Sequence, residues 1–156
     1  MFERFTKESR AAVQAALAEA GRSGSPTVEA EHLLVALAGG TGPAARTLHE
    51  AGLDPDRTRT AIAEQFERTL ATVAVDPAAF DLPDPRPVAK PRVAASAKLA
   101  LERSLKVAVE RKDRHLGSEH LLLALLRAEA GTVPRLLAAE GLDPADLADR
   151  LKAQLA

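Results

Sequence analysis

Hydrophobic residues in the first part of the chain recur every three or four positions, the spacing of one face of an α-helix. In the first such segment, Thr6 is a suitable N-cap, Phe5 can act as a hydrophobic staple, and the pattern stops at Gly21 and Gly24. The apolar face consists of Val13, Ala16, Leu17 and Ala20. The pattern therefore predicts a helix that begins after Thr6 and ends near Gly21.

Three further helices are predicted before residue 72. The second ends at Gly39, the third runs from near Pro43 to Gly52, and the fourth is capped by Asp54 with Pro55 at its first position. Their buried stripes are expected to be Leu33, Leu34 and Leu37 in the second helix, and Ile62, Phe66 and Leu70 in the fourth.

The second half of the chain repeats this pattern. Its four predicted helices are marked by Leu101, Leu105 and Ala108; by Leu121, Leu122 and Leu125; by residues 135–140; and by Leu147, Leu151 and Leu155 after an Asp143-Pro144 start. No segment alternates apolar and polar residues with period two, so no strand is predicted. The sequence thus predicts an all-α fold of eight helices.

Two blocks of sequence occur twice in the same order. The tetrapeptide EHLL at residues 31–34 returns at residues 119–122, an offset of 88, and GLDP at residues 52–55 returns at residues 141–144, an offset of 89. Matched order and spacing indicate an internal duplication. Because a unit this small buries its apolar faces better against a copy, we expect two four-helix repeats about a pseudo-twofold axis.

A proline-rich segment separates the two units. Residues 72–92 hold five of the ten prolines, which predicts an extended linker, with Phe80 and Leu82 as candidates to anchor it to the surface. The predicted organisation is a single domain with repeat one at residues 1–71, the linker at 72–92 and repeat two at 93–156.

The composition narrows the classes of function. A formal charge of −1 and four aromatic residues, all Phe, argue against nucleic-acid binding, which uses phosphate neutralisation and base stacking. The chain has no cysteine, which removes disulfides, thiolate zinc sites and thiol nucleophiles. The charged start MFERFTKESR is no signal peptide, and no run approaches the length of a membrane helix, so a cytoplasmic protein is expected.

A duplicated four-helix unit that opens with Met-Phe-x-x-Phe-Thr and carries an acid-His-Leu-Leu helix resembles the N-terminal domain of the Clp ATPases, most closely the ClpC type. The resemblance rests on MFERFT at residues 1–6, EHLLVAL at 31–37, EHLLLAL at 119–125 and GTGPAARTLHEAGL up to Leu53. It implies a non-catalytic domain that binds adaptors and substrates of the Clp protease, without a cofactor or metal.

The resemblance also implies specific binding residues. In ClpC-type domains the motif glutamates contact the guanidinium of phosphoarginine, which places Glu31 and Glu119 in this role, and the threonine that lies by the phosphate corresponds to Thr6. Ala94 stands where the second threonine is expected, and Val93 stands where the family usually has an aromatic residue. The resemblance therefore favours a working site in repeat one, with Glu31 and Thr6 as partners.

A second binding face is implied by the actinobacterial members of the family, which bind cyclic-peptide antibiotics on the first helices of both repeats. The matching positions are Phe2, Arg10, Val13, Lys98, Leu101 and Glu102. The chain contains no G-x-x-x-x-G-K-[ST] motif and so lacks the ATPase chemistry. A stand-alone domain is favoured over a segment of a longer ATPase, because the linker is long and the repeats have diverged. The alternative function is a protein that sequesters a Clp-directed cyclic peptide.

Each motif residue also has a purely structural interpretation. Glu31 at a helix start is stabilised by the helix dipole even without a ligand, and Ser118 is a proper N-cap where Ala30 is not. His32 and His120 are expected to be packed, hydrogen-bonded residues, because a zinc site would need further ligands. An acid-base pair of adjacent helical residues is not expected, since their side chains point about 100° apart. Arg10 and Lys98 are either solvated charges or a basic spot that attracts phosphate or acidic peptide segments.

Overall fold

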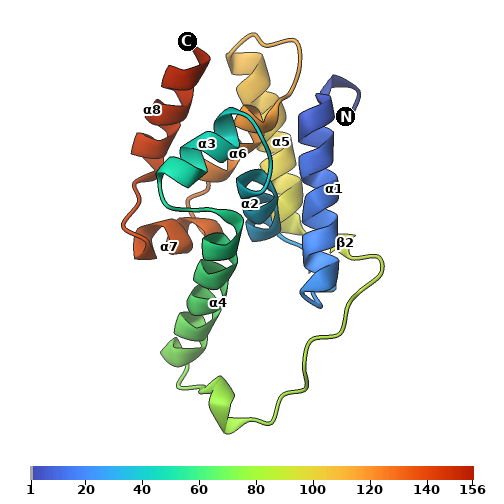
Figure 1. Ribbon diagram of the computed structural model, residues 1–156, viewed down its shortest axis with the longest axis vertical. Helices are drawn as coiled ribbons and strands as arrows, with labels where there is room; N and C mark the ends of the chain where they lie inside the picture. Colours follow the sequence, from blue (N-terminus) through green and yellow to red (C-terminus); the bar gives the residue numbers. More distant parts are fainter. Residues whose placement is uncertain (1) are drawn as a thin grey trace.

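The computed structural model describes residues 2–156. Within this range the chain forms eight α-helices, two short 3₁₀ helices and two short strands (Figure 1). They are η1 (Phe2–Arg4), α1 (Lys7–Arg22), β1 (Thr27–Val28), α2 (Ala30–Ala38), α3 (Pro43–Glu50), α4 (Pro55–Thr72), η2 (Pro77–Ala79), β2 (Arg92–Val93), α5 (Ala95–Glu110), α6 (Ser118–Leu126), α7 (Thr132–Ala139) and α8 (Pro144–Leu155). The predicted all-α fold of eight helices is confirmed.

Three helices, α1, α4 and α8, begin where the capping residues predict. Thr6 Oγ1 accepts a hydrogen bond from the Ser9 backbone N–H at 3.1 Å, and Asp54 Oδ1 accepts one from the Arg57 N–H at 2.7 Å. Asp143 caps α8 with the same kind of bond. Each cap satisfies a backbone donor that the first turn of a helix leaves without a partner.

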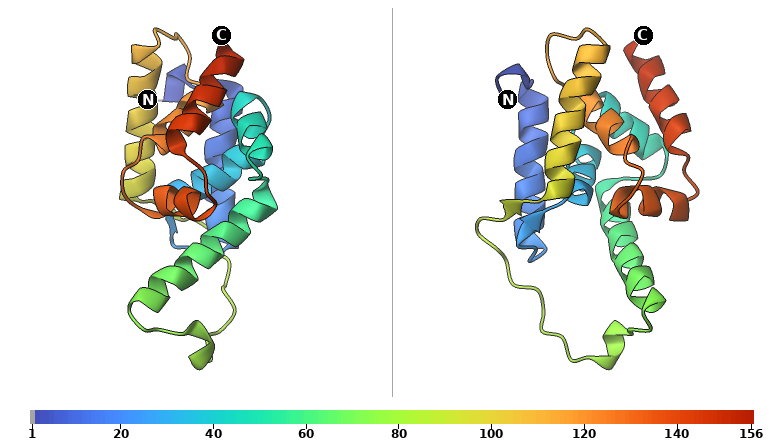
Figure 2. Two further views of the ribbon diagram at one scale, coloured as in Figure 1. Left: turned by 90° about the vertical axis from the view of Figure 1, so that its left-hand side faces the viewer. Right: turned by 180° about the vertical axis from the view of Figure 1, so that it is seen from behind.

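The two repeats pack against each other with matched contacts. The first helix of each repeat contacts the second helix of the other, in the pairs α1–α6 and α5–α2. The third helix of each repeat contacts the second helix of the other, in the pairs α3–α6 and α7–α2, and also the fourth, in the pairs α3–α8 and α7–α4. The helices α2 and α6 lie at the centre, where residues 33–38 and 121–126 are all buried, as a helix that is apolar on every side requires (Figure 2). One core thus serves both repeats, in the arrangement that a pseudo-twofold axis predicts.

The prediction that the chain forms no strand is wrong. β1 and β2 pair in parallel, with Thr27 opposite Arg92 and Val28 opposite Val93, and an isolated bridge joins Phe5 to Leu116. These pairings involve one or two residues each, which is too short for an alternating pattern to show in the sequence. Both pairings join the segment before the first helix of one repeat to the segment before the second helix of the other.

The predicted buried stripe of α4 is only partly buried. Ile62 and Leu70 are half-buried, but Phe66 is 61% exposed. α4 has 18 residues and is about 27 Å long, and its second half extends beyond α2 and α7, the helices on which its first half packs (Figure 1). The pattern correctly predicts the apolar side of the helix but not where its contacts end.

The linker is attached to the domain by its backbone and not by its large apolar side chains. Phe80 and Leu82 are 58% and 65% exposed, so the prediction that they anchor the linker is wrong. Instead the Val88 N–H donates to the Gly21 carbonyl at 2.9 Å. A Cβ at Gly21 would lie 2.6 Å from the Val88 carbonyl oxygen, so only glycine allows this approach.

Candidate functional site

Each repeat places the start of its first helix on the other repeat. The Thr6 N–H donates to the Leu116 carbonyl at 2.9 Å, two residues before α6, and the Ala94 N–H donates to the Val28 carbonyl at 3.0 Å, two residues before α2. Any site at the start of α2 or α6 is therefore built from both halves of the chain.

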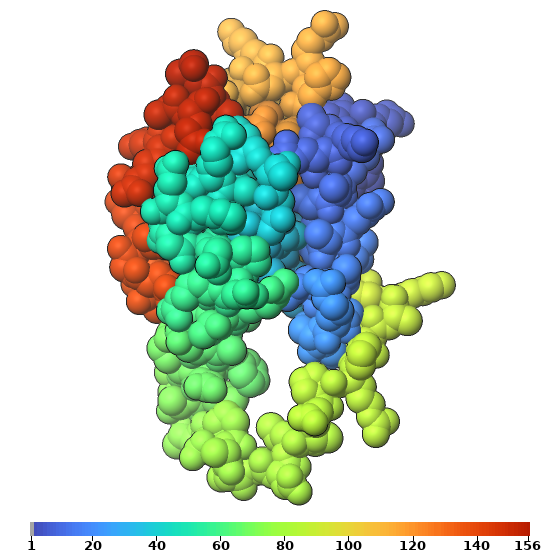
Figure 3. Space-filling model, in the orientation of Figure 1, coloured from blue at the N-terminus to red at the C-terminus, as the bar shows by residue number. Residues whose placement is uncertain are grey.

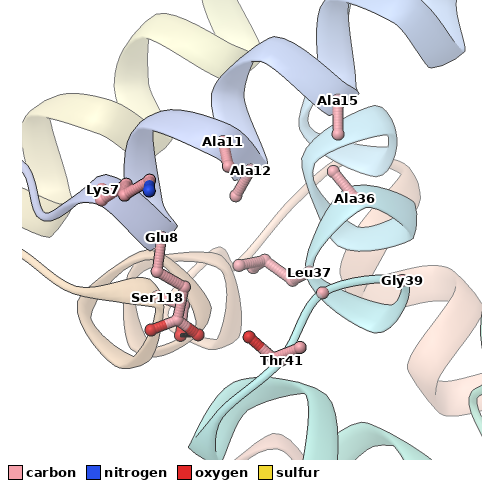
Figure 4. Close-up of a pocket in the computed structure, with 11 residues that line it drawn as sticks. Lys7, Glu8, Ala11, Ala12, Ala15, Ala36, Leu37, Gly39, Thr41 and Ser118 are labelled. Carbon is pink, nitrogen blue, oxygen red and sulfur yellow. Dashed lines mark hydrogen bonds between the residues drawn. The ribbon is translucent and has the colours of Figure 1, made fainter.

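Two pockets lie at these junctions. The first, here named the Glu31 pocket, has a volume of about 580 Å³ and includes the polar residues Glu29, Glu31, Ser96, Arg103, Glu129 and Thr132. The second, the Ser118 pocket, has a volume of about 560 Å³ and includes Lys7, Glu8, Ala11, Ala15, Leu37 and Ser118. Figure 4 shows Glu8 reaching from α1 toward Ser118 at the start of α6.

The two pockets are equivalent under the duplication. Adding the offset of 88 to positions 8, 11, 12, 36 and 37 of the Ser118 pocket gives 96, 99, 100, 124 and 125, all of which line the Glu31 pocket. Their chemistry has diverged, because Ala15 is replaced by Arg103 and Glu8 by Ser96. The Glu31 pocket contains three carboxylates and one guanidinium, whereas the Ser118 pocket is lined mainly by small apolar residues.

Glu31 lies at the start of α2 and is half-buried. Burial raises the pKa of its carboxyl above the usual value, and the negative charge of Glu29 raises it further. The ionised carboxylate is thus poorly hydrated where it lies. A guanidinium that donates two parallel hydrogen bonds to the carboxylate would replace the hydrogen bonds that burial removes from it.

A hydroxyl from the other repeat completes the start of α2. The Ala30 N–H donates to Ser96 Oγ at 3.0 Å, and Ser96 Oγ donates to the Glu29 carboxylate. The Glu29 N–H in turn donates to Nδ1 of His32 at 2.8 Å, and burial lowers the pKa of His32. The expectation that Ala30 occupies the N-cap position is wrong, because Glu29 is the N-cap and Ala30 is the first helical residue. Ser96 supplies the acceptor for the Ala30 N–H. No local sequence signal could have identified Ser96.

Glu119 is placed differently from Glu31. Its carboxylate turns back over Gly117, where a Cβ would lie 2.4 Å from Glu119 Oε2, so the glycine makes room for it. The prediction that Ser118 caps α6 is wrong, because Gly117 is the N-cap and Ser118 is the first helical residue. Ser118 Oγ instead donates to Glu8 Oε1 at 3.0 Å, which joins α6 to α1.

The expected pairing of Glu31 with Thr6 is corrected by these contacts. Thr6 lies against Leu116, in the segment that leads to Glu119, and the segment that leads to Glu31 lies against Ala94. The threonine and the glutamate of one junction thus come from different repeats. The physical reason is that the first helix of each repeat packs its N-terminus on the other repeat.

His120 has a structural role, as its pattern predicts. It is 1% exposed, Nδ1 accepts from the Gly117 N–H at 2.9 Å, and Nε2 donates to Asp113 Oδ2 at 2.8 Å. The bond from His120 lowers the pKa of Asp113. Contrary to the expectation for adjacent helical residues, Glu119 Oε1 comes within 3.3 Å of His120 Nδ1. That nitrogen already accepts a backbone hydrogen bond, so the pair does not share a proton.

The residues of the predicted cyclic-peptide face have unequal exposure. Phe2, Arg10, Lys98 and Glu102 are exposed, Val13 is half-buried and Leu101 is buried. The ring of Phe2 lies 4.9 Å from that of Phe5, and Arg10 Nη2 donates to the Phe2 carbonyl at 3.2 Å. Among the residues that the structure describes, these six line neither the Glu31 pocket nor the Ser118 pocket.

Within residues 2–156 the structure brings together no group of three or more His, Cys, Asp or Glu side chains with the geometry to hold a metal ion. No helix in this range has the length and apolar character needed to cross a membrane.

The sequence matches a known family model over most of its length. The model for the Clp repeat (R) N-terminal domain matches residues 4–81 and 92–156. The chain is 36% identical over 149 residues to the chaperone protein ClpC2, chloroplastic, of Oryza sativa subsp. japonica and to ClpC1, chloroplastic, of Arabidopsis thaliana. These matches cover 94% of this chain but only 15% and 14% of the two relatives.

Solved structures support the same assignment of the fold. The N-terminal domain of ClpD from Arabidopsis thaliana superposes with a TM-score of 0.73 at 20% identity and covers 100% of both chains. The Hsp104 N-terminal domain from Candida albicans gives a TM-score of 0.65 at 17% identity, with 96% of this chain and 89% of that chain covered.

Proposed function

The chain belongs to the Clp repeat N-terminal domain family, and on this basis we propose that it is a non-catalytic, cytoplasmic binding domain of Clp proteolysis. Its ligands are peptide segments of adaptors, substrates or phosphoarginine-marked proteins. The observation that carries the proposal is the Glu31 pocket, in which a half-buried carboxylate with a raised pKa lies at a helix start.

The chemistry of the pocket supports an arginine-type side chain as the ligand. A guanidinium compensates the poorly hydrated carboxylate of Glu31, and the apolar wall formed by Leu99, Ala100 and Leu125 suits the methylene stem of the same side chain. A phosphate on the guanidinium would meet Arg103 and the Ser96 hydroxyl. At the other junction Thr6 and Glu119 remain the proposed threonine and glutamate, although neither lines the Ser118 pocket.

Calorimetric titration with free phosphoarginine and with a phosphoarginine peptide tests the proposal. Glu31→Gln keeps the shape of the side chain but removes its charge, and we expect it to weaken binding at least tenfold. Glu129→Gln is the matched control, because Glu129 lines the same pocket but is exposed, and it should change affinity less than threefold. The proposal is abandoned if the protein binds neither phosphoarginine nor any Clp component while a ClpC-type domain binds in parallel.

The second candidate function is capture of a Clp-directed cyclic peptide, which would protect the cellular ATPase. It is favoured by the 48% exposed ring of Phe2, a residue whose backbone carbonyl accepts a hydrogen bond from Arg10. Phe2→Ala should reduce cyclic-peptide binding more than Glu31→Ala does, and the reverse should hold for phosphoarginine. Equal effects of both variants on both ligands would contradict both assignments.

A further inference from the structure

The second half of α4 carries an apolar stripe that the rest of the domain leaves uncovered. Within residues 55–72, all of which the structure describes, the last buried side chain is Gln65. Beyond it the stripe continues through Phe66, 61% exposed, and half-buried Leu70 to Val73, 67% exposed. In Figure 3 an opening separates this part of α4 from the linker. The exposed fractions of Phe66 and Val73 show that the described chain leaves the stripe uncovered.

The exposed surface is larger than a compact chain of this mass would have. The accessible surface is 9015 Å², against about 7,500 Å² expected for a compact protein of 16.5 kDa, an excess of roughly 1,500 Å². The excess is a total for the whole chain, and a standard interface needs about 800 Å² from each partner. Of the exposed large apolar side chains among residues 2–156, four lie in this projecting region: Phe66, Val73, Phe80 and Leu82.

The charge pattern of α4 favours a second copy of the chain as the occupant. Ile62, Phe66, Thr69 and Val73 recur at intervals of four and three, the spacing of a helix-pairing seam. The positions that flank this seam are uncharged, namely Ala63, Gln65, Leu70 and Thr72, whereas the charged Glu64, Glu67 and Arg68 lie on the opposite side of the helix. A seam without charged edges can meet its own copy about a twofold axis without like-charge repulsion.

We propose that the Phe66–Val73 stripe of α4 is a self-association surface through which two copies of this chain form a twofold dimer. The pairing covers the apolar stripe that a single chain leaves in water. A dimer also presents two Glu31 pockets, which strengthens binding to a protein with more than one mark by raising the effective concentration of the second site. The self-association itself does not depend on what the pocket binds.

Sedimentation equilibrium and light scattering of the full chain over roughly 1 μM to 500 μM, a range that spans ordinary dimer affinities, test this proposal. The expected mass rises from 16.5 kDa toward twice that value. Phe66→Glu should raise the dissociation constant at least tenfold and leave the thermal unfolding of the monomer unchanged, because the side chain is exposed. Val109→Glu is the matched control, since Val109 on α5 is 62% exposed but lies outside the stripe. A mass that stays at 16.5 kDa up to the highest concentration overturns the proposal, as does equal dissociation by both variants.

Discussion

The two motif histidines are predicted to differ in how much they stabilise the fold. His120 is 1% exposed and holds two partners, the Gly117 N–H and Asp113. His32 is half-buried, and its Nδ1 accepts a hydrogen bond from the Glu29 N–H. Because the histidines occupy the same position in the two repeats, His120→Ala and His32→Ala form a matched pair of perturbations.

The structure sets the expected magnitudes. His120→Ala leaves the buried Gly117 N–H without an acceptor, which costs about 1–3 kcal/mol. Loss of the bond to Asp113 adds about 1 kcal/mol, less than a buried charged bond would, because the Asp113 side chain is 38% exposed and water replaces the ring. The total of about 3 kcal/mol corresponds to a fall in Tm of about 6–12 °C. For His32→Ala, where water can reach Glu29, we expect about 1 kcal/mol and about 2–4 °C.

Urea denaturation followed by circular dichroism, with thermal scans alongside, measures both losses. Asp113→Ala serves as the internal control, because it removes the second partner of His120 and keeps the bond to the Gly117 N–H. It also removes the partly exposed ion pair between Asp113 and Arg111, and together these losses should cost about 1 kcal/mol. Equal losses for the two histidine variants, or a larger loss for His32→Ala, would refute the reasoning that burial and a second partner set the difference.

Two further predictions concern the starts of helices. Ala94 caps α5 without a side-chain hydrogen bond. Its φ and ψ angles of −77° and 167° are close to the −66° and 164° of the capping residue Thr6. Ala94→Ser should therefore stabilise the fold by about 1 kcal/mol, and Thr6→Ala should destabilise it by a similar amount, in the same urea titration. Glu31→Gln should raise Tm at pH 7 but not near pH 3. The folded state raises the pKa of Glu31, so ionisation of this carboxyl destabilises the fold. This loss of stability is absent below the usual carboxyl pKa and complete above the raised pKa. A Tm difference between the variant and the unmodified protein that does not change with pH would contradict the assignment.

Local signals account for most of what the sequence predicted. Thr6, Asp54 and Asp143 cap helices with side chains that act within three residues, and the leucines of EHLL follow the period of one buried helix. The duplication could be recognised because both copies kept these local signals. The eight helices and the doubled architecture therefore followed from pattern alone.

The parts that could not be predicted depend on how the repeats meet. Ser96 completes the start of α2 from 66 residues away, and Thr6 lies against the second repeat and not the first. Phe66 has the spacing of a core residue, but α4 extends past the surfaces that would bury it. Periodicity identifies the apolar side of an element but does not show which neighbour covers it.

We propose that the binding sites of this domain are shared between its repeats. Chemical-shift mapping of the ¹⁵N-labelled protein during titration with a phosphoarginine peptide tests this sharing. We predict that the residues shifted together with Glu31 belong to α5 and α6, with Ser96, Leu99 and Arg103 among them. Shifts confined to α1–α4 would contradict the account, as would the absence of any shift at saturating peptide.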